Sequence, residues 1–311
     1  MMLCFDIGGS AIKGAVAHDA RNPRLIGTLP TPLEDFTAFA SAIAMLADGS
    51  GAPATTPIAI AITGVVDPRT GVIKCANIPG IDGRPLAAEL AARLGRRVIV
   101  ANDADCFALA EAQEGSGRGH AIVFGAILGT GVGGGLVVDG RLVTGAGGFA
   151  GEWGHGPVAA TSAGNPPATL PRFVCGCGQT GCVDTIGGAR GLERLHRHLH
   201  GADLPSTAII AAWEAGDSVA ARTIDVFVDL VAGPLALVIN VVGADIVPVG
   251  GGLSRSTALV EALDAAVRAR ILRRTTQPLL VPASLTVEPG LIGAALLGND
   301  RVASPAPQVQ S

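Results

Sequence analysis

Three cysteines lie within eight residues, in the pattern C-x-C-x4-C that Cys175, Cys177 and Cys182 form. One histidine, His155, precedes this cluster by twenty residues. Zn²⁺ prefers four soft or borderline ligands in a tetrahedron, and three cysteines with one histidine are a common structural set. The glycines between the cysteines let a short loop turn sharply enough to place three sulfurs around one ion. The spacing therefore predicts a structural zinc site.

The same cysteines have two alternative interpretations, a disulfide and a chance pair of neighbouring thiols. A disulfide within C-x-C closes a very small ring and is strained, which favours the metal. The other cysteines, Cys4, Cys75 and Cys106, stand among apolar residues and are expected to be small buried side chains. The first residues carry neither a basic segment nor the apolar run of a signal peptide, so we expect a reducing cytoplasm.

A glycine turn next to an acid opens the chain. The apolar run Met2–Ile7 contains Asp6 and is followed by Gly8-Gly9-Ser10. A second alternating segment begins at Lys13, so strand, turn and strand predict a β-hairpin. A Walker phosphate loop, which opens a helix, is absent from the sequence. Backbone N–H groups of such a turn can approach phosphates while Asp6 holds Mg²⁺, and an ordinary β-turn is the alternative.

Two further glycine patches repeat this arrangement. Residues Gly129–Gly135 carry five glycines among seven residues, between two apolar segments. Such a run costs chain entropy, which indicates a backbone that lies against something large. Gly250–Gly252 stand where a predicted strand gives way to a helix, a position suited to adenosine or phosphate contact. Two glycine hairpins, one in each half, predict a duplicated architecture with a cleft between the halves.

The elements that would position these residues alternate between strand and helix. Strands are predicted, from apolar runs, at Met2–Ile7, Lys13–His18, Ile58–Thr63, Arg97–Ala101, Ala121–Leu128 and Asp245–Val249. Helices are predicted, from helical spacing of apolar residues, at Leu33–Ala47, Pro85–Leu94, Cys106–Gln113, Arg222–Val242 and Pro289–Leu297. Asp103 or Asp105 is expected to cap the helix that contains Cys106. The alternation predicts an α/β fold.

Composition restricts the classes of function. The 311 residues predict one large or two medium domains, and 49% hydrophobic residues fill a large core. The net charge of −4 provides no basic field for nucleic acid. The apolar stretch Leu230–Ala244 is interrupted by Pro234 and Asn240 and is shorter than the ~20 residues that span a membrane, so a buried helix is predicted. The histidines of Glu193–His200 are two apart, and a solvated helix face is predicted for them.

Five motifs occur along the chain in order: Phe5–Ser10 (FDIGGS), Asn102-Asp103, Gly129–Gly135, Glu152-x-Gly-His155 and the cysteine pattern of residues 175–182. In this order they resemble the ROK family (repressors, open reading frames and sugar kinases), from residue 4 to about residue 297. The resemblance implies an α/β chain with the actin/hexokinase-like (ribonuclease H-like) ATPase fold, in which two α/β domains flank a cleft. The implied activity is ATP-dependent phosphorylation of the 6-hydroxyl of an amino sugar or hexose, with Mg²⁺ and structural Zn²⁺. A homodimer that binds neither nucleic acid nor membrane is also implied.

Domain boundaries and site residues follow from the same resemblance. The small domain is expected at residues 1–118 with a helix near 290–298, the larger domain with its zinc loop at 119–289, and a flexible tail at 299–311. Asp103 would be the general base, and the implied sugar-binding residues are Gly64, Asn77, Asn102, Asp103, Glu152, His155 and Asp184. The implied ATP-binding residues are Asp6 with Mg²⁺, Gly8, Gly9, Ser10, Lys13, Gly129, Thr130, Gly131, Gly133, Gly251 and Gly252. The implied zinc ligands are His155, Cys175, Cys177 and Cys182, with the second ring nitrogen of His155 facing the sugar.

Three positions depart from the family pattern. Ser10-Ala11 stands where Thr-Lys or Thr-Asn is usual, and Thr63-Gly64 where Pro-Gly is usual. Asp184 replaces a sugar-contacting Glu and is one methylene shorter. The alternatives to a kinase are a sugar-sensing repressor, which needs a DNA-binding domain before the first glycine turn, a glycosidase whose carboxylate pair is Asp103 and Glu152, and a sugar-binding protein without catalysis.

Overall fold

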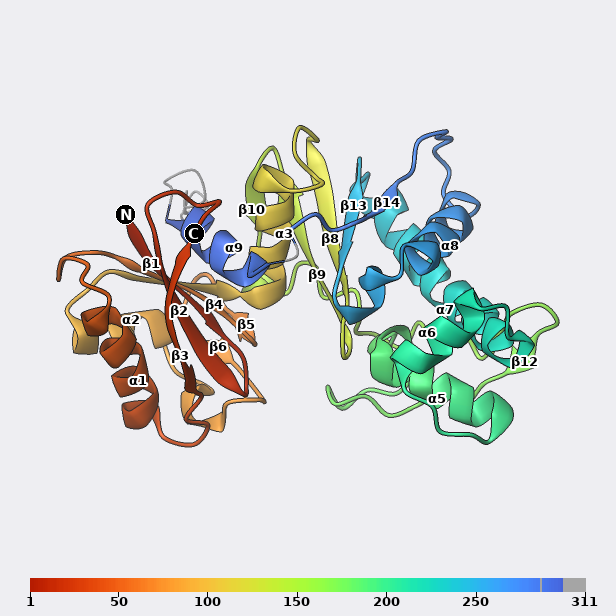
Figure 1. Cartoon of the computed structure of the whole chain (residues 1–311), viewed down its shortest axis with the longest axis horizontal. Helices are drawn as coiled ribbons and strands as arrows, with labels where there is room; N and C mark the ends of the chain where they lie inside the picture. The colour runs from red at the N-terminus through yellow and green to blue at the C-terminus, as the bar shows by residue number, and fades with distance from the viewer. Residues whose placement is uncertain (286, 299–311) are drawn as a thin grey trace, which may run out of the picture. The chain divides into compact units, whose positions relative to one another are not determined.

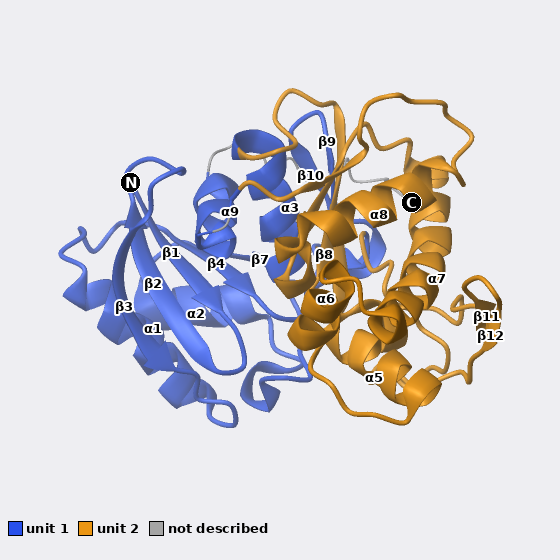
Figure 2. Cartoon of the chain, turned by 45° about the vertical axis from the view of Figure 1, so that its right-hand side comes forward, with its two compact units in different colours: residues 1–114, 136–150, 285–311 blue, residues 115–135, 151–284 orange. Residues whose placement is uncertain are grey.

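A computed structural model describes residues 1–285 and 287–298 of the chain, so the predicted flexible tail at 299–311 lies outside the described residues. The chain divides into two compact units (Figure 2). Unit 1 comprises Met1–Glu114, Leu136–Ala150 and the described residues from Leu285 onward, and unit 2 comprises Gly115–Gly135 and Gly151–Ser284. Each unit is described by itself below.

Unit 1 is built on a five-stranded sheet in the order β3-β2-β1-β4-β7 (Figure 2). Its strands are β1 Met2–Ile7, β2 Ala11–Ala17, β3 Arg24–Pro30, β4 Ile58–Ile62 and β7 Val98–Asn102. The first three strands pair antiparallel, whereas β1, β4 and β7 pair parallel. All five residues of β4 are apolar and buried, as expected for a parallel strand covered on both faces.

Four helices cover this sheet. They are α1 Phe36–Gly49, α2 Leu86–Leu94, α3 Asp103–Glu114 and α9 Pro289–Leu297. Helices α1 and α2 contact each other, and α3 packs against α9 (Figure 1). A Cβ added to Gly293 of α9 would lie 2.1 Å from the carbonyl oxygen of Cys106, so only glycine permits this close helix packing. The predicted helices at residues 85–94 and 289–297 are confirmed, and α2 ends at Gly95 with a left-handed φ of 64°.

Short elements complete unit 1. They are β5 Val65–Val66, β6 Ile73–Lys74, η1 Pro79–Ile81, β10 Arg141–Val143 and η2 Ala146–Gly148. The stretch 136–150, expected in the larger domain, belongs to unit 1. It does so because β10 contacts α3, and the side-chain amide of Gln113 donates to the carbonyl oxygen of Gly140 at 2.9 Å.

The second sheet has the order β10-β9-β8-β13-β14. Its further strands are β8 Ile122–Leu128, β9 Val132–Val138, β13 Val247–Gly250 and β14 Leu280–Pro282, and the division between the units falls within β9. The helices of unit 2 are α4 Asp184–Gly187, α5 Ala189–His200, α6 Ser206–Glu214, α7 Ser218–Val242, η3 Gly252–Arg255 and α8 Thr257–Arg268. A two-stranded sheet joins β11 Ser162–Ala163 to β12 Ala168–Thr169. The predicted β8 hairpin and the β13 strand are therefore both formed.

Helix α7 is long and apolar enough to span a membrane by length and composition, the one such helix in the part of the chain that the structure describes. It packs against α5, α6 and α8, and Val226, Phe227 and Val231 on its inner face are fully buried. Half of its most apolar window is buried in this way. Residues 230–242 of the apolar stretch thus belong to a helix with one face in the core of unit 2, which confirms the predicted helix, while Leu237 and Val241 are exposed.

The histidines of α5 correct one prediction. His196 is only 4% exposed, so the solvated face predicted for Glu193–His200 is wrong at this position. His196 and His200 are four residues apart and therefore share a face of the helix, with ring centroids 5.0 Å apart. Their ring nitrogens lie 2.9 Å and 3.1 Å from the hydroxyl of Thr223 on α7. His196 is therefore hydrogen-bonded to the buried Thr223 hydroxyl and not, as the sequence pattern predicts, to solvent.

Candidate active-site residues

The first glycine turn of unit 1 joins β1 to β2. The N–H of Gly8 donates to the carbonyl oxygen of Ala11 at 3.1 Å, which closes the turn. Thr31 fixes it from outside, because its hydroxyl donates to the carbonyl oxygen of Gly8 at 2.7 Å. A Cβ added at Gly8 would meet no atom within 4 Å, and one at Gly9 would lie 3.6 Å from the carbonyl oxygen of Asn77. The turn is held by its neighbours while Gly8 faces open space.

Charged residues of both chain ends meet beside this turn. Asp6 and Lys13 are cross-strand partners in the β1–β2 register. The Lys13 ammonium donates to both carboxylate oxygens of Glu288, at 2.9 Å and 3.0 Å. The pKa of Asp6 is raised to about 6, chiefly by burial and also by the charges of Asp103 and Glu288, while the Lys13 charge lowers it. A hard cation would relieve this crowding of negative charge, so the surroundings of Asp6 fit Mg²⁺.

Glu288 is a site residue that the sequence did not reveal. It precedes Pro289 at the start of α9, which marks it as a helix-start position but says nothing of Lys13. Its φ of 48° is unusual for a residue with a side chain. The conformation turns the chain into α9 while the side chain pairs with Lys13.

Asn102 organises the predicted sugar residues of unit 1. Its side-chain N–H donates to the carbonyl oxygen of Gly64 at 2.9 Å. Its side-chain oxygen accepts from the N–H of Ala104 at 2.8 Å and of Asp105 at 3.2 Å, so Asn102 caps α3. The expectation that Asp103 or Asp105 provides the cap is therefore wrong. Instead Asp103 is the first residue of the helix, where the partial positive charge of the N-terminus stabilises a carboxylate.

Gly64 and Asn77 lie beside this cap. The side-chain N–H of Asn77 donates to the hydroxyl of Thr63 at 3.2 Å. Gly64 has a φ of 115°, and a Cβ there would lie 2.8 Å from the carbonyl oxygen of Lys74. The loop after β4 thus needs glycine at this position. The structure thus brings four predicted residues together at the carboxyl ends of β4 and β7: Gly64, Asn77, Asn102 and Asp103. The loop Thr63-Gly64 joins them, because Asn77 bonds to Thr63 and Asn102 bonds to Gly64.

The predicted metal ligands are assembled in unit 2. One ligand atom from each of His155, Cys175, Cys177 and Cys182 lies within 4.8 Å of all the others. The Cys177 and Cys182 sulfurs are 3.6 Å apart, and the Cys175 sulfur is 3.7 Å from Nδ1 of His155. Bonds of ~2.3 Å from zinc to sulfur place tetrahedral ligands roughly 3.8 Å apart. The arrangement therefore fits a tetrahedral ion held by three sulfurs and one ring nitrogen.

The second ring nitrogen of His155 faces an acid. Nε2 lies 3.7 Å from a carboxylate oxygen of Glu152, away from the cysteines. Burial raises the pKa of Glu152, the His155 charge lowers it, and the Asp184 charge raises it. With Nδ1 on the metal, Nε2 of His155 and the Glu152 carboxylate form a polar pair suited to hydroxyl groups.

The two glycine patches of unit 2 lie against each other. Gly129–Gly131 form the tight turn between β8 and β9, in which the N–H of Gly129 donates to the carbonyl oxygen of Gly131 at 3.0 Å. A Cβ added at Gly251, whose φ is 90°, would lie 2.6 Å from the N–H nitrogen of Gly129. The indole N–H of Trp153 donates to the carbonyl oxygen of Gly133 at 2.8 Å. The predicted nucleotide-binding residues Gly129 and Gly251 are thus in contact, and the hydrogen bond from Trp153 to Gly133 supports the hairpin that begins at Gly129.

Asp184 has two partners within unit 2. One carboxylate oxygen accepts from the N–H of Val132 at 2.8 Å, just after the hairpin turn. The other oxygen lies 3.7 Å from the sulfur of Cys175. The residue expected to contact sugar therefore lies between the cysteine cluster and the glycine hairpin.

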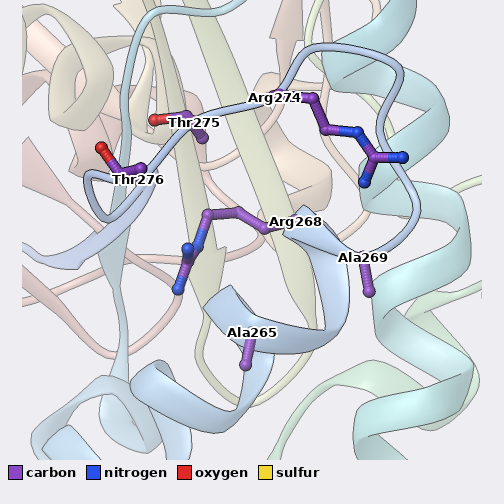
Figure 3. A pocket seen from close by; sticks show the side chains of 6 residues that line it. All are labelled: Ala265, Arg268, Ala269, Arg274, Thr275 and Thr276. Atoms are coloured by element: carbon purple, nitrogen blue, oxygen red, sulfur yellow. The ribbon is translucent and has the colours of Figure 1, made fainter.

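A separate cavity at the end of α8 holds none of the predicted site residues (Figure 3). It is lined by Ala265, Arg268, Ala269, Arg274, Thr275 and Thr276. The Arg268 guanidinium is already paired with Asp264 at 2.7 Å. This cavity takes no part in the sites described above.

Comparison with known proteins identifies the family. Residues 2–301 match the ROK family along almost the whole chain. The chain belongs to the ROK family. It is 37% identical over 298 residues to N-acetyl-D-glucosamine kinase of Pasteurella multocida (strain Pm70), covering 94% of this chain and 97% of that protein. It is 36% identical over 300 residues to the N-acetyl-D-glucosamine kinase of Citrobacter koseri, with the same coverage.

Solved structures agree with the predicted fold. The ROK hexokinase of Thermus thermophilus superposes with a TM-score of 0.79 at 31% identity, over 95% of this chain and 96% of that one. The ROK family glucokinase of Streptomyces griseus, solved with glucose and AMPPNP, gives a TM-score of 0.75 at 26% identity, over 95% and 98%. The chain has the actin/hexokinase-like fold of these sugar kinases, which confirms the predicted fold class.

Proposed function

We propose that this chain is an ATP-dependent kinase that phosphorylates the 6-hydroxyl of N-acetyl-D-glucosamine. The observation that carries the proposal is the arrangement at Asn102, whose side chain binds Gly64 and caps the helix that begins with Asp103. This arrangement holds a carboxylate at a fixed position beside polar groups that can bind hydroxyls. The identity to two N-acetyl-D-glucosamine kinases supports the choice of sugar.

Asp103 acts as the general base in this mechanism. Phosphoryl transfer needs positioning, charge neutralisation and a group that accepts the proton of the attacking hydroxyl. The Asp103 carboxylate accepts that proton as the bond from the sugar oxygen to the γ-phosphorus of ATP forms and the bond from the γ-phosphorus to ADP breaks, a contribution of roughly 10²–10⁴-fold in rate. In unit 1, Asn102, Asn77 and the backbone at Gly64 would bind sugar hydroxyls; in unit 2, Glu152 and Nε2 of His155 would do so.

ATP binds to the glycine patches. In unit 1 the turn Gly8–Ser10 and Lys13 bind phosphate oxygens, and Asp6 holds Mg²⁺. In unit 2 the turn Gly129–Gly131, with Gly133, and the contiguous Gly251 and Gly252 receive the nucleotide through backbone N–H groups. Mg²⁺, when bound, neutralises charge on the transferred phosphate.

Zinc has a structural role in the proposal. His155, Cys175, Cys177 and Cys182 hold it, and their spacing supports a tetrahedral ion. Fixing His155 at Nδ1 orients Nε2 and the neighbouring Glu152 toward the sugar. We further propose that the protein is cytoplasmic and forms a homodimer; sedimentation of the purified protein tests the homodimer.

A second substrate is the alternative. Glucose, N-acetylmannosamine or fructose would be phosphorylated by the same groups, and the likeness to a glucokinase favours glucose among them. A sugar-binding protein without catalysis is the other alternative, and its basis is that Ala11 and Asp184 depart from the family pattern.

A coupled assay of ADP release with the four sugars tests the proposal. N-acetyl-D-glucosamine should give the highest kcat/KM, and a higher value for another sugar would replace it as the substrate. Asp103→Asn should lower kcat roughly 10²–10⁴-fold while sugar still binds in a calorimetric titration. Asp19→Asn, the same change on an exposed loop of unit 1, is the matched control and should keep full turnover. An Asp103→Asn variant with most of its turnover would exclude Asp103 as the base.

A further inference from the structure

Asp184 stands at the start of α4, two residues after the metal ligand Cys182. The segment around it is buried and firmly bonded. Cys182, Val183 and Thr185 are at most 4% exposed, and the Thr185 hydroxyl donates to the carbonyl oxygen of Cys182 at 2.7 Å. The N–H of Asp184 donates to the carbonyl oxygen of Gly154 at 2.8 Å. Because this segment is closely packed, any movement of Cys182 also moves Asp184.

Residues of α4 and the start of α5 are bonded in turn to the glycine hairpin. The Asp184 carboxylate accepts from the N–H of Val132 at 2.8 Å, and the N–H of Ala189 donates to the carbonyl oxygen of Gly129 at 2.8 Å. A Cβ added at Gly131 would lie 2.2 Å from the same carboxylate oxygen, and one at Gly188 would lie 2.7 Å from Cα of Gly131. The hairpin turn and α4 thus fit without free space.

We infer that Asp184 is a positioning residue that couples the metal site to the nucleotide-binding hairpin, so that metal and nucleotide each strengthen the binding of the other. The inference rests on the proposed function, because it takes Gly129–Gly131 as a nucleotide site. One carboxylate oxygen is committed to the hairpin N–H and the other lies against Cys175, so Asp184 serves the hairpin rather than the sugar. A hydrogen bond that a backbone N–H donates to a charged carboxylate holds that N–H in a fixed direction.

The first test measures binding of AMPPNP with Mg²⁺ by calorimetry to zinc-loaded protein. Asp184→Ala should raise the Kd roughly tenfold, as expected for loss of a charge-assisted hydrogen bond. Asp184→Asn keeps an oxygen that can accept from Val132 and should restore the Kd to within about threefold of wild type. The KM for sugar should change by less than about twofold in both variants, which a general loss of folding would not produce.

Asp245→Ala is the matched control. The Asp245 carboxylate also accepts a backbone N–H of β8, that of Ile122 at 2.9 Å, but at the end of the strand far from the hairpin. This variant should bind AMPPNP as wild type does. A raised sugar KM with an unchanged Kd for AMPPNP in Asp184→Ala would overturn the inference and make Asp184 a sugar ligand.

The second test measures zinc affinity by competition with a chelator, with and without AMPPNP. Because coupling is reciprocal, AMPPNP should tighten zinc binding to wild type by the same factor by which zinc tightens AMPPNP binding. The factor should fall close to one in Asp184→Ala. A factor of one in wild type overturns the coupling alone, whereas a wild-type chain that binds no AMPPNP overturns the proposed function and the inference with it.

Discussion

The Lys13 ammonium lies 2.9 Å and 3.0 Å from the two carboxylate oxygens of Glu288, 275 positions further along the chain. The hydrogen bond that Lys13 donates to Glu288 raises the pKa of the Lys13 ammonium, so Lys13 stays charged. Their side chains are 40% and 28% exposed, so solvent screens the pair. The pair therefore contributes little to the stability of the fold, and its main effect is to orient the Lys13 ammonium beside the glycine turn of unit 1.

Lys13→Met should raise the KM for ATP roughly tenfold, because a charged contact to phosphate is lost. Steady-state kinetics with varied ATP measure this change. Glu288→Gln is the conservative comparison: it keeps Lys13 and an amide oxygen that can accept from it, so it should change the KM for ATP by less than about threefold and the free energy of unfolding by less than ~1 kcal/mol. An unchanged KM in Lys13→Met would show that this ammonium does not bind phosphate.

Removal of the metal should destabilise unit 2. A ligand present at a thousand times its Kd stabilises a folded protein by about 4 kcal/mol, and chelation removes that amount. Cys177→Ser should abolish stoichiometric zinc and lower the melting temperature. Elemental analysis and thermal unfolding with and without chelator measure both effects. Cys4→Ala, in the buried core of unit 1, should keep one zinc per chain. Freshly purified wild-type protein without zinc would refute the metal site.

Gly293→Ala should lower the free energy of unfolding by about 1–3 kcal/mol, the usual cost of overpacking. The added Cβ would meet the carbonyl oxygen of Cys106 at 2.1 Å and push α9 away from α3. Gly49→Ala in α1 is the control, because a Cβ there meets nothing within 4 Å and alanine favours the helix by about 1 kcal/mol. Urea unfolding of both variants measures the difference. Equal stability of the two would contradict the close packing of α3 and α9.

His196 should make stability depend on pH. Burial lowers the pKa of His196, and the charge of His200 lowers it further, while Asp217 opposes them. The folded chain therefore keeps His196 neutral where the unfolded chain binds a proton, so stability falls as the pH drops below about 6.5. His196→Asn should flatten this decline in denaturant unfolding between about pH 8 and about pH 5. An identical decline in wild type and variant would assign the effect to other groups.

The sequence predicts best what short segments determine. The β1–β2 hairpin follows from two apolar strands around Gly8 and Gly9, and the metal cluster follows from ligands that are close along the chain. The helix at Pro289–Leu297 follows from its composition and its proline start. In these cases local spacing and backbone preference already define the geometry.

Contacts between distant segments were not predictable. The cap of α3 is Asn102 rather than Asp103, because the side chain of Asn102 is also held by Gly64. Residues 136–150 belong to unit 1 because β10 packs on α3, which no local pattern indicates. His196 is buried because Thr223 on another helix offers a partner. Glu288 and Asp184 likewise have roles set by partners that only the tertiary fold brings near.

Trp153, with its indole N–H on the carbonyl oxygen of Gly133 and its ring edge-on to Phe124, gives the protein a built-in optical probe. The sequence has two tryptophans and no tyrosine, so Trp213→Phe leaves a single fluorophore. The fluorescence emission of Trp153 in that variant would then report changes in the conformation of the glycine hairpin. Nucleotide arrival could be timed by stopped flow without attaching any dye.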